Sequence, residues 1–159
     1  MNKVYFLLGS NMNNPVKQLT KAKSLLIKQI GNIVRESSIY ETAAWGNPNQ
    51  PNFLNQVIII NSNLSAQKTM QTILKIEEKM GRVRTKKNAP RIIDIDILFF
   101  NKDIVAEPNL IVPHPLLQQR RFVITPLNEL SPNFKHPILK KTIHQLLQLC
   151  TDKLDVKKF

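Results

Sequence analysis

The sequence predicts an α+β fold in which helices pack on an antiparallel β-sheet. Three observations support this prediction. Apolar runs with strand character and amphipathic helical patterns follow one another in the order β-α-β-β-α-β. Glycine, asparagine and proline stand at the ends of these segments, where turns and caps require them. The chain has 159 residues and no Pro/Gly/Ser-rich linker, so we expect a single domain over residues 1–159.

The first strand and the first helix are marked by clear boundaries. Residues 4–8 form a continuous apolar run that stops at Gly9. Asn14 is a helix cap and Pro15 suits the first helical position. Apolar side chains then recur at helical spacing as far as about residue 30, where Gly31 ends the helix; they are Leu19, Ala22, Leu26 and Ile30. This apolar stripe needs a sheet to cover.

Two strands, a second helix and another strand follow. Residues 33–42 and 53–61 have strand composition, and the loop of residues 43–52 between them is longer than a tight hairpin needs. Long loops of this kind often bind a ligand. Ser65 caps a helix that reaches Met80 and ends at Gly81. Residues 92–100 form the next strand.

This order is the split βαβ arrangement of ferredoxin-like folds, in which two helices cover one face of an antiparallel sheet. From residue 109 onward the chain is punctuated by prolines. We expect only short helices there, ending in a helix around residues 142–150. The predicted fold is therefore a ferredoxin-like βαββαβ core with a short helical C-terminal extension.

Composition limits the classes of function. No apolar run approaches the roughly 20 residues of a membrane helix, and the apolar stretch at the N-terminus is too short for a signal peptide. We therefore expect a cytoplasmic protein that does not enter a membrane. The formal net charge of +12 favours anionic partners. Nucleic acid and phosphorylated small molecules both satisfy that condition.

Asp94 and Asp96 are the first candidates for chemistry. Strand alternation sends Ile93, Ile95 and Ile97 to one face and both carboxylates to the other. Their Cα atoms would be roughly 6.5 Å apart. The oxygens can then converge on one magnesium ion, or on two ions roughly 4 Å apart. A bare Asp-x-Asp is also compatible with the solvated face of a half-buried strand.

A cationic segment precedes these carboxylates. Residues 81–91 contain no acid and carry five basic side chains, which are Arg82, Arg84, Lys86, Lys87 and Arg91. Guanidinium groups beside metal-binding carboxylates suit the transfer of a polyphosphate, because both neutralise and align phosphate oxygens. A solvated loop, or one that contacts RNA, is the alternative.

Two further residues have open interpretations. Glu77 lies on the apolar face of the second helix, so its carboxylate either forms a structural salt bridge with an arginine or helps to organise a nucleotide site. His114 is held between Pro113 and Pro115. It either contacts a nucleotide or is a structural loop histidine.

Several segments together resemble a known family. They are, in chain order, Leu8-Gly9-Ser10-Asn11, Tyr40-Glu41-Thr42, Gln50-Pro51-Asn52-Phe53-Leu54-Asn55, Gly81-Arg82-Val83-Arg84, Pro90-Arg91-Ile92-Ile93-Asp94-Ile95-Asp96, Val112-Pro113-His114 and Arg120-Arg121-Phe122. In this order they resemble the 6-hydroxymethyl-7,8-dihydropterin pyrophosphokinases of folate biosynthesis. The resemblance covers nearly the whole chain.

The resemblance implies a diphosphotransferase that moves pyrophosphate from ATP to the pterin alcohol and releases AMP. Magnesium, as two ions, would be bridged by Asp94 and Asp96, and Arg82 and Arg91 would be catalytic. The implied ATP-binding residues are Glu77, Arg84, Arg91, Ile97, His114 and Arg120. The implied pterin-binding residues are Thr42, Ala43, Ala44, Trp45, Phe53, Asn55 and Phe122.

Stacking by Phe53 and Phe122, with an amide at the ring edge, suits a flat polar heterocycle, although core packing is the alternative for both rings. The resemblance also implies direct in-line attack by the pterin hydroxyl on the β-phosphorus. ATP and the pterin would be the partners, with neither nucleic acid nor membrane involved. A folate-pathway enzyme, fused or associated, is a further expectation.

The competing interpretation is a nucleic-acid-binding module. A charge of +12 on a ferredoxin-like sheet with Phe53 and Phe122 fits an RNA-recognition domain. The aromatic-rich signature that such domains place on central strands is missing from this sequence. Asp94 and Asp96 would also repel phosphate where the sheet should attract it.

Overall fold

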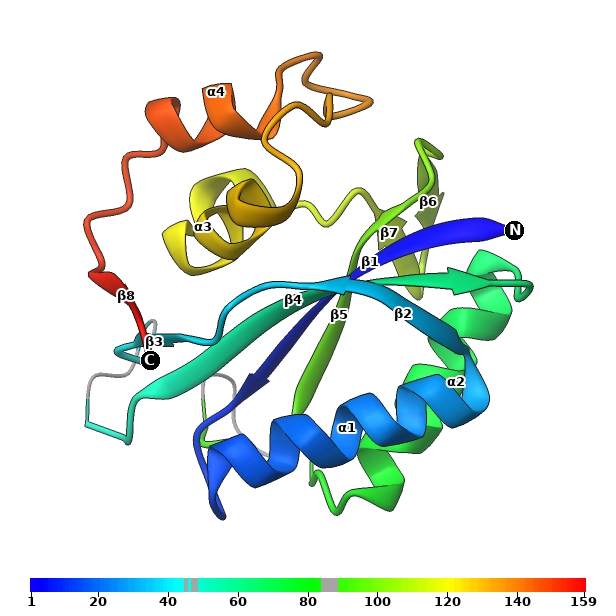
Figure 1. Ribbon diagram of the computed structural model, residues 1–159, viewed down its shortest axis with the longest axis vertical. Coiled ribbons are helices and arrows are strands. Elements are labelled where there is room, and N and C mark those ends of the chain that lie inside the picture. Colours follow the sequence, from blue (N-terminus) through cyan, green and yellow to red (C-terminus); the bar gives the residue numbers. More distant parts are fainter. Residues whose placement is uncertain (45, 47–48, 84–88) are drawn as a thin grey trace.

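The computed structural model describes residues 1–44, 46, 49–83 and 89–159. Its elements surround one antiparallel sheet (Figure 1). The helices are α1 (Pro15–Gln29), α2 (Ala66–Lys79), the 3₁₀ turn η1 (Leu117–Gln119), α3 (Arg121–Leu130) and α4 (Ile143–Leu149). The strands are β1 (Asn2–Ser10), β2 (Gly31–Glu36), β3 (Tyr40–Thr42), β4 (Phe53–Ser62), β5 (Asp94–Phe100), β6 (Val105–Glu107), β7 (Leu110–Val112) and β8 (Val156–Lys158).

The main sheet has the order β5-β1-β4-β3-β8, and β2 also pairs with β4. This arrangement confirms the predicted β-α-β-β-α-β core, but the predicted strand of residues 33–42 is wrong as a single element. It is divided into β2 and β3 at Ser37. There the Ser37 N–H donates to Val57 O at 2.9 Å, the Val57 N–H donates to Ser37 Oγ at 3.0 Å, and Gln56 Nε2 donates to Ser37 O at 2.7 Å. These local bonds replace the regular ladder.

The predicted helices α1 and α2 cover one face of the sheet (Figure 1). Asn14 caps α1 by accepting the Lys17 N–H, and Ser65 caps α2 by accepting the Lys68 N–H. Leu19 and Leu26 of α1 and Ile73 of α2 are buried against alternate side chains of β1, β4 and β5. The apolar stripes predicted from the sequence therefore form the core on this face.

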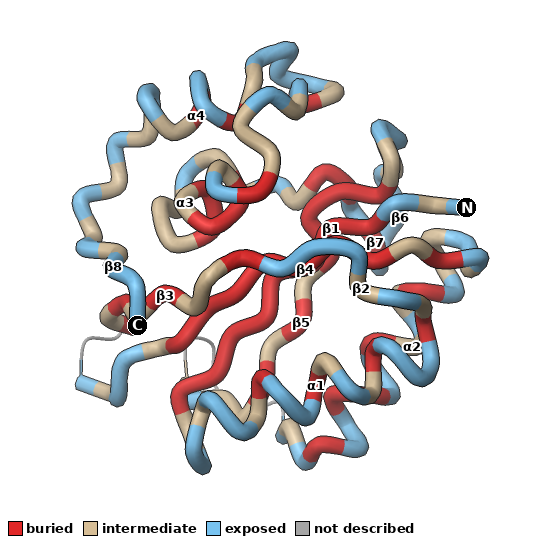
Figure 2. The backbone as a smooth tube through the Cα atoms, in the orientation of Figure 1, coloured by how far each residue is buried: buried red, intermediate tan, exposed pale blue. Residues whose placement is uncertain are grey.

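The opposite face is covered by α3 and α4. Val123 and Leu127 of α3 and Ile143 at the start of α4 pack against Tyr5, Val57, Ile59 and Phe99 of the sheet. Because both faces are buried, β1 and β4 carry continuous apolar runs instead of an alternating pattern. Figure 2 shows these strands buried along most of their length.

The C-terminal extension is more structured than predicted. The helix predicted around residues 142–150 is confirmed as α4, with Thr142 as its cap. The short helices expected from residue 109 onward also include η1 and the ten-residue α3, which contains Pro126. The hairpin β6–β7 and the strand β8 did not appear in the prediction. Among the described residues no helix is long and apolar enough to span a membrane. The single-domain assignment stays a prediction.

Candidate active site

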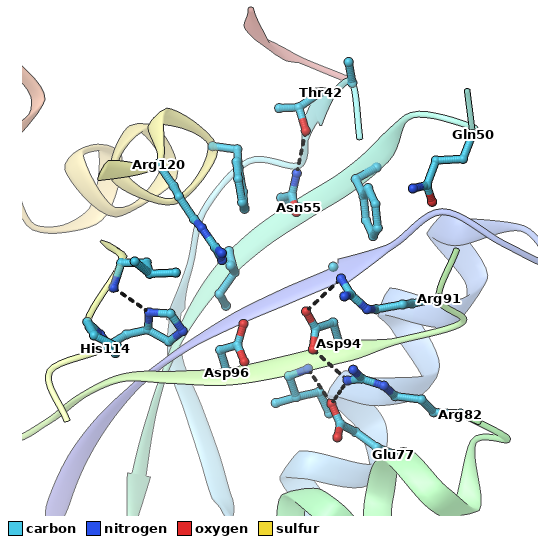
Figure 3. A pocket seen from close by; sticks show the side chains of 18 of the residues that line it. Thr42, Gln50, Asn55, Glu77, Arg82, Arg91, Asp94, Asp96, His114 and Arg120 are labelled. Atoms are coloured by element: carbon cyan, nitrogen blue, oxygen red, sulfur yellow. Dashed lines mark hydrogen bonds and ion pairs between the residues drawn. The ribbon is translucent and has the colours of Figure 1, made fainter. Parts of the chain in front are cut away.

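A cavity of about 470 Å³ lies on the sheet face opposite α1 and α2, beside the start of α3 (Figure 3). Twelve of the predicted site residues line it together: Thr42, Ala43, Phe53, Asn55, Glu77, Arg82, Arg91, Asp94, Asp96, His114, Arg120 and Phe122. Leu7, Gly9, Gln50, Met70, Ile95, Pro115 and Leu116 complete the lining. Residues from six separate segments of the sequence therefore meet in one cavity.

The two aspartates lie on the first residues of β5, as strand alternation predicted. Ile93, Ile95 and Ile97 are buried in the core beneath α1 and α2, while Asp94 and Asp96 face the cavity. The β1–β5 register places Asp94 opposite Gly9 and Asp96 opposite Leu7. Both carboxylates therefore line the wall of a cavity and do not simply lie on an open, solvated face of the strand.

Glu77 and Arg82 support Asp94 from the edge of the sheet. Arg82 Nη1 donates to Glu77 Oε2 at 2.8 Å and to Asp94 Oδ1 at 2.7 Å. Glu77 Oε2 also accepts the backbone N–H of Ile95 at 2.8 Å, which holds α2 against the free edge of β5. Arg91 Nη1 lies 3.7 Å from Asp94 Oδ2 on the other side. Glu77 thus forms the salt bridge considered from the sequence, and the same carboxylate also binds the β5 backbone beside Asp94.

The electrostatics of Asp96 favour a bound cation. Burial, together with the negative charges of Asp94 and Glu77, raises the pKa of Asp96 to about 8, and Arg120 and Arg82 only partly oppose this shift. A carboxylate in such surroundings is destabilised when it is ionised without further positive charge. The oxygen pair therefore has the character of a site for a hard divalent cation.

His114 and Arg120 form the wall beyond Asp96. Burial and the neighbouring Arg120 charge lower the pKa of His114 to about 4, so its imidazole is neutral at physiological pH. Its Nδ1 accepts the backbone N–H of Leu116 at 3.2 Å. The proton of the neutral ring is therefore on Nε2, which is available to donate toward an anionic oxygen.

The other half of the cavity has aromatic and amide character. Phe53 of β4 and Phe122 of α3 line it, and the Arg120 guanidinium lies 5.8 Å from the centroid of the Phe122 ring. Asn55 is buried beside them and donates from Nδ2 to Thr42 Oγ1 at 3.2 Å. Gly9, with no side chain, leaves the floor open between Asn55 and Asp94, its partners on the two neighbouring strands.

Comparison with known proteins identifies the family. Residues 5–132 match the model of the 7,8-dihydro-6-hydroxymethylpterin-pyrophosphokinase (HPPK) family. The chain belongs to this family. A pyrophosphokinase of Aquifex aeolicus, named for 2-amino-4-hydroxy-6-hydroxymethyldihydropteridine, is 39% identical over 91% of this chain and 90% of its own length. A Synechocystis protein of the same name is 37% identical over 89% of this chain and 72% of its own length.

Some HPPK relatives are much longer. The chain spans only 22% of a folic acid synthesis protein of Dictyostelium discoideum, to which it is 36% identical over 91% of its own length. It also spans 43% of the wild-type HPPK-DHPS protein of Plasmodium falciparum, whose crystal structure it matches with a TM-score of 0.75 at 21% identity over 94% of this chain. This structural match supports the predicted ferredoxin-like fold. Family membership makes the chain a pyrophosphokinase, which favours that interpretation over an RNA-recognition domain.

Four other residues are implied by the HPPK resemblance. Ala44 is buried and does not line the cavity. Ile97 lines a second cavity of about 280 Å³, which shares Asp96 and His114 with the first. Trp45 and Arg84 lie outside the residues that the structure describes. Their predicted roles therefore rest on the resemblance alone.

Asn11 does not line the cavity but supports segments that do, and sequence reasoning did not assign it this role, although its motif belongs to the HPPK resemblance. Its buried amide donates to Gln50 Oε1 at 2.8 Å and to Pro51 O at 3.0 Å, while Asn11 Oδ1 accepts the Arg91 N–H at 2.8 Å. The Asn11 N–H also donates to Arg91 O at 3.1 Å. One side chain therefore joins the segments that precede Phe53 and Asp94.

Proposed function

We propose that the cavity transfers pyrophosphate from ATP to 6-hydroxymethyl-7,8-dihydropterin and that its two halves bind the two substrates. One observation carries this proposal. The carboxylates Asp94 and Asp96, surrounded by Arg82, Arg91 and Arg120, share a single cavity with the aromatic and amide group of Phe53, Asn55 and Phe122. A polyphosphate and a flat heterocycle can therefore meet within it. We expect this reaction in the cytoplasm.

Asp94 and Asp96 suit magnesium. Within the described part of the chain no group of three His, Cys, Asp or Glu side chains could hold a metal ion. Magnesium commonly takes one or two protein carboxylates and completes its shell with water and substrate phosphates. The raised pKa of Asp96 indicates that this pair lacks positive charge. We propose two magnesium ions, which would neutralise the phosphate charge that develops during transfer.

Arginines and a neutral histidine would hold the phosphates. Arg82 and Arg91 contact Asp94, so their guanidinium groups lie where phosphates bound near the carboxylates would pass. Arg120 and His114 stand on the Asp96 side and would donate to further phosphate oxygens. The second cavity, lined by Ile97, continues beyond His114 and would receive the adenine; Arg84 stays a proposed phosphate ligand.

Phe53 and Phe122 would hold the pterin by its two faces. Asn55 presents an amide that can both donate and accept, and Thr42 fixes its orientation through the bond from Asn55 Nδ2. The backbone of Ala43, which lines the cavity, would complete the recognition of the ring edge, and the HPPK resemblance extends this proposed role to Ala44 and Trp45. With the ring held there, its hydroxymethyl group would point across Gly9 toward Asp94.

The chemistry then requires positioning and charge stabilisation. The pterin hydroxyl oxygen attacks the β-phosphorus in line and a new O–P bond forms. The bond from the β-phosphorus to the α,β-bridging oxygen breaks, releasing AMP, and the hydroxyl proton passes to solvent. Arg82 and Arg91 are proposed as the catalytic residues that stabilise the charge on the transferring group. No covalent enzyme intermediate is needed.

The test is a product assay with the purified chain. Incubation with ATP, magnesium and 6-hydroxymethyl-7,8-dihydropterin should yield AMP and the pterin diphosphate in equal amounts. Removal of magnesium by a chelator should stop the reaction, and added magnesium should restore it. Formation of ADP, or no product with both substrates and magnesium present, would refute the proposal.

A further inference from the structure

The last ten residues form a segment that we call the C-terminal strap, residues 150–159. It leaves the end of α4, passes α3 and finishes beside β3 as β8 (Figure 1). The family match ends at residue 132, so the strap lies outside it. Its hydrogen bonds to other elements reach the start of α3 and the β3 region.

One end of the strap holds the start of α3. That helix has no local side-chain cap, since Arg120 at its N-cap position makes no capping bond. Asp152 supplies the cap from a distance, because its Oδ2 accepts the Arg121 N–H at 3.0 Å. In return Arg121 donates from Nε to Asp152 O at 2.8 Å and from Nη2 to Cys150 O at 3.0 Å. Asp152 Oδ1 accepts the Leu154 N–H at 3.0 Å, which fixes the carboxylate.

The other end of the strap is a strand partner of β3. In β8, Val156 stands opposite Thr42 and Lys158 opposite Tyr40. The Phe159 N–H donates to Ile39 O at 2.9 Å, just beyond the ladder. The strap therefore covers the β3 edge that faces away from β4.

Each of the two elements that the strap joins carries a lining residue of the proposed pterin half. Phe122 lies on the first turn of α3, directly after Arg121, and Thr42 is the last residue of β3. A second link closes the frame at the far end of α3. There Glu129 accepts the Tyr40 hydroxyl at 2.6 Å and the Ser38 hydroxyl at 3.0 Å. The strap thus joins the start of α3 to β3, and Glu129 joins the far end of α3 to Tyr40 of β3.

We propose that the C-terminal strap is a positioning element for pterin binding, with Asp152 as its positioning residue. It sets the separation between Phe122 and the Thr42–Asn55 pair. This inference rests on the proposed function, because it assigns the pterin to that space. Of the proposed phosphate ligands that the structure describes, Arg120 adjoins the Arg121 that the strap holds. Arg82, Arg91 and both aspartates belong to segments to which the strap makes no hydrogen bond in the described structure, so MgATP should depend on the strap less than the pterin does.

The test compares KM for the pterin with KM for MgATP. Asp152→Ala should raise the pterin KM about tenfold, because misplacing a group in the site by about 1 Å can cost about 100-fold in activity and a smaller shift costs less. The MgATP KM should change less than about threefold. Asp152→Asn keeps one acceptor oxygen and should restore part of the pterin affinity.

Asp155→Ala is the matched control. Asp155 is an exposed residue of the same strap, and its carboxylate accepts no hydrogen bond in the described structure, so its loss removes the same charge without releasing α3. Its pterin KM should equal that of the parent chain. An equal rise for Asp155→Ala and Asp152→Ala would overturn the proposal in favour of a general charge effect.

Removing residues 156–159 tests the other end. If the strap acts as one tether, this truncation should raise the pterin KM to a similar extent, and combining it with Asp152→Ala should add little. Effects that multiply, or equal losses for both substrates, would overturn the proposal. If the parent chain itself forms no product, the proposed function fails. An active parent with an unchanged pterin KM in Asp152→Ala refutes the strap alone.

Discussion

Gly9→Ala is the substitution that most directly tests whether one half of the cavity binds the pterin and the other half binds the ATP phosphates. Gly9 stands between Asn55 on β4 and Asp94 on β5. A Cβ atom at this position would lie 3.1 Å from Asn55 Oδ1 and 3.8 Å from Phe53 Cδ1. The first contact is too close, so the Asn55 amide must move by a few tenths of an ångström. Its bond to Thr42 Oγ1, already 3.2 Å long, should be lost.

The expected cost falls on pterin binding. A misplaced amide loses one or two neutral hydrogen bonds of about 1 kcal/mol each. The pterin KM should therefore rise about 5- to 30-fold. The free energy of unfolding should stay within about 1 kcal/mol of the parent's. Alanine loses less conformational freedom on folding than glycine does, and this gain offsets the strain.

Steady-state assays with the pterin varied at saturating MgATP, together with urea unfolding, measure both quantities. Gly31→Ala is the contrast, since its Cβ would lie 1.9 Å from Asn61 O and should cost stability without changing the pterin KM. An unchanged pterin KM in Gly9→Ala, or an equal rise in the MgATP KM, would refute the reasoning.

Three further predictions concern the metal pair, the loop contacts and pH. Asp94→Ala and Asp96→Ala should each abolish turnover and leave unfolding within about 1 kcal/mol of the parent, since both residues face a cavity; full activity in either variant would contradict the metal assignment. Asn11→Asp should lower kcat/KM at least tenfold. It replaces the Nδ2 donor by an oxygen that faces two acceptors, Gln50 Oε1 and Pro51 O. Full activity of this variant would contradict the role of Asn11. Burial lowers the pKa of His136, whose Nδ1 accepts two backbone N–H groups. As pH drops below 6.5, His136 therefore takes up a proton in the unfolded chain before it does so in the folded chain, and the free energy of unfolding should fall. This fall should be smaller in His136→Gln than in the control His144→Gln. Equal pH slopes in the two variants would exclude His136 as the cause.

Local signals explain how much of the fold could be predicted. The caps at Asn14 and Ser65 mark the starts of α1 and α2 in the sequence, because each capping hydrogen bond joins residues only three apart. Alternation along β5 placed Asp94 and Asp96 on the cavity face for the same reason. These parts of the fold and site depend on short-range geometry that a sequence displays directly.

Long-range contacts explain what could not be predicted. The cap of α3 comes from Asp152, 31 residues away, so no local pattern marks the helix start, and Pro126 inside it argued for a break. The buried Glu77 carboxylate is stabilised by the hydrogen bond that it accepts from the Ile95 N–H. That bond forms only because α2 packs against β5, so no local pattern predicts it. Gln50 similarly enters the cavity through its contact with Asn11.

The same Glu77 contact has a consequence for self-association. Strand β5 is the edge of the sheet, and unpaired edges invite pairing with other chains. Here Glu77 occupies the outward Ile95 N–H, and the His114 N–H donates to Leu98 O at 3.0 Å further along. Two residues that border the cavity therefore also protect this edge. A substitution that frees it should reduce solubility as well as catalysis, so substrate binding and resistance to aggregation depend on the same contacts at this strand.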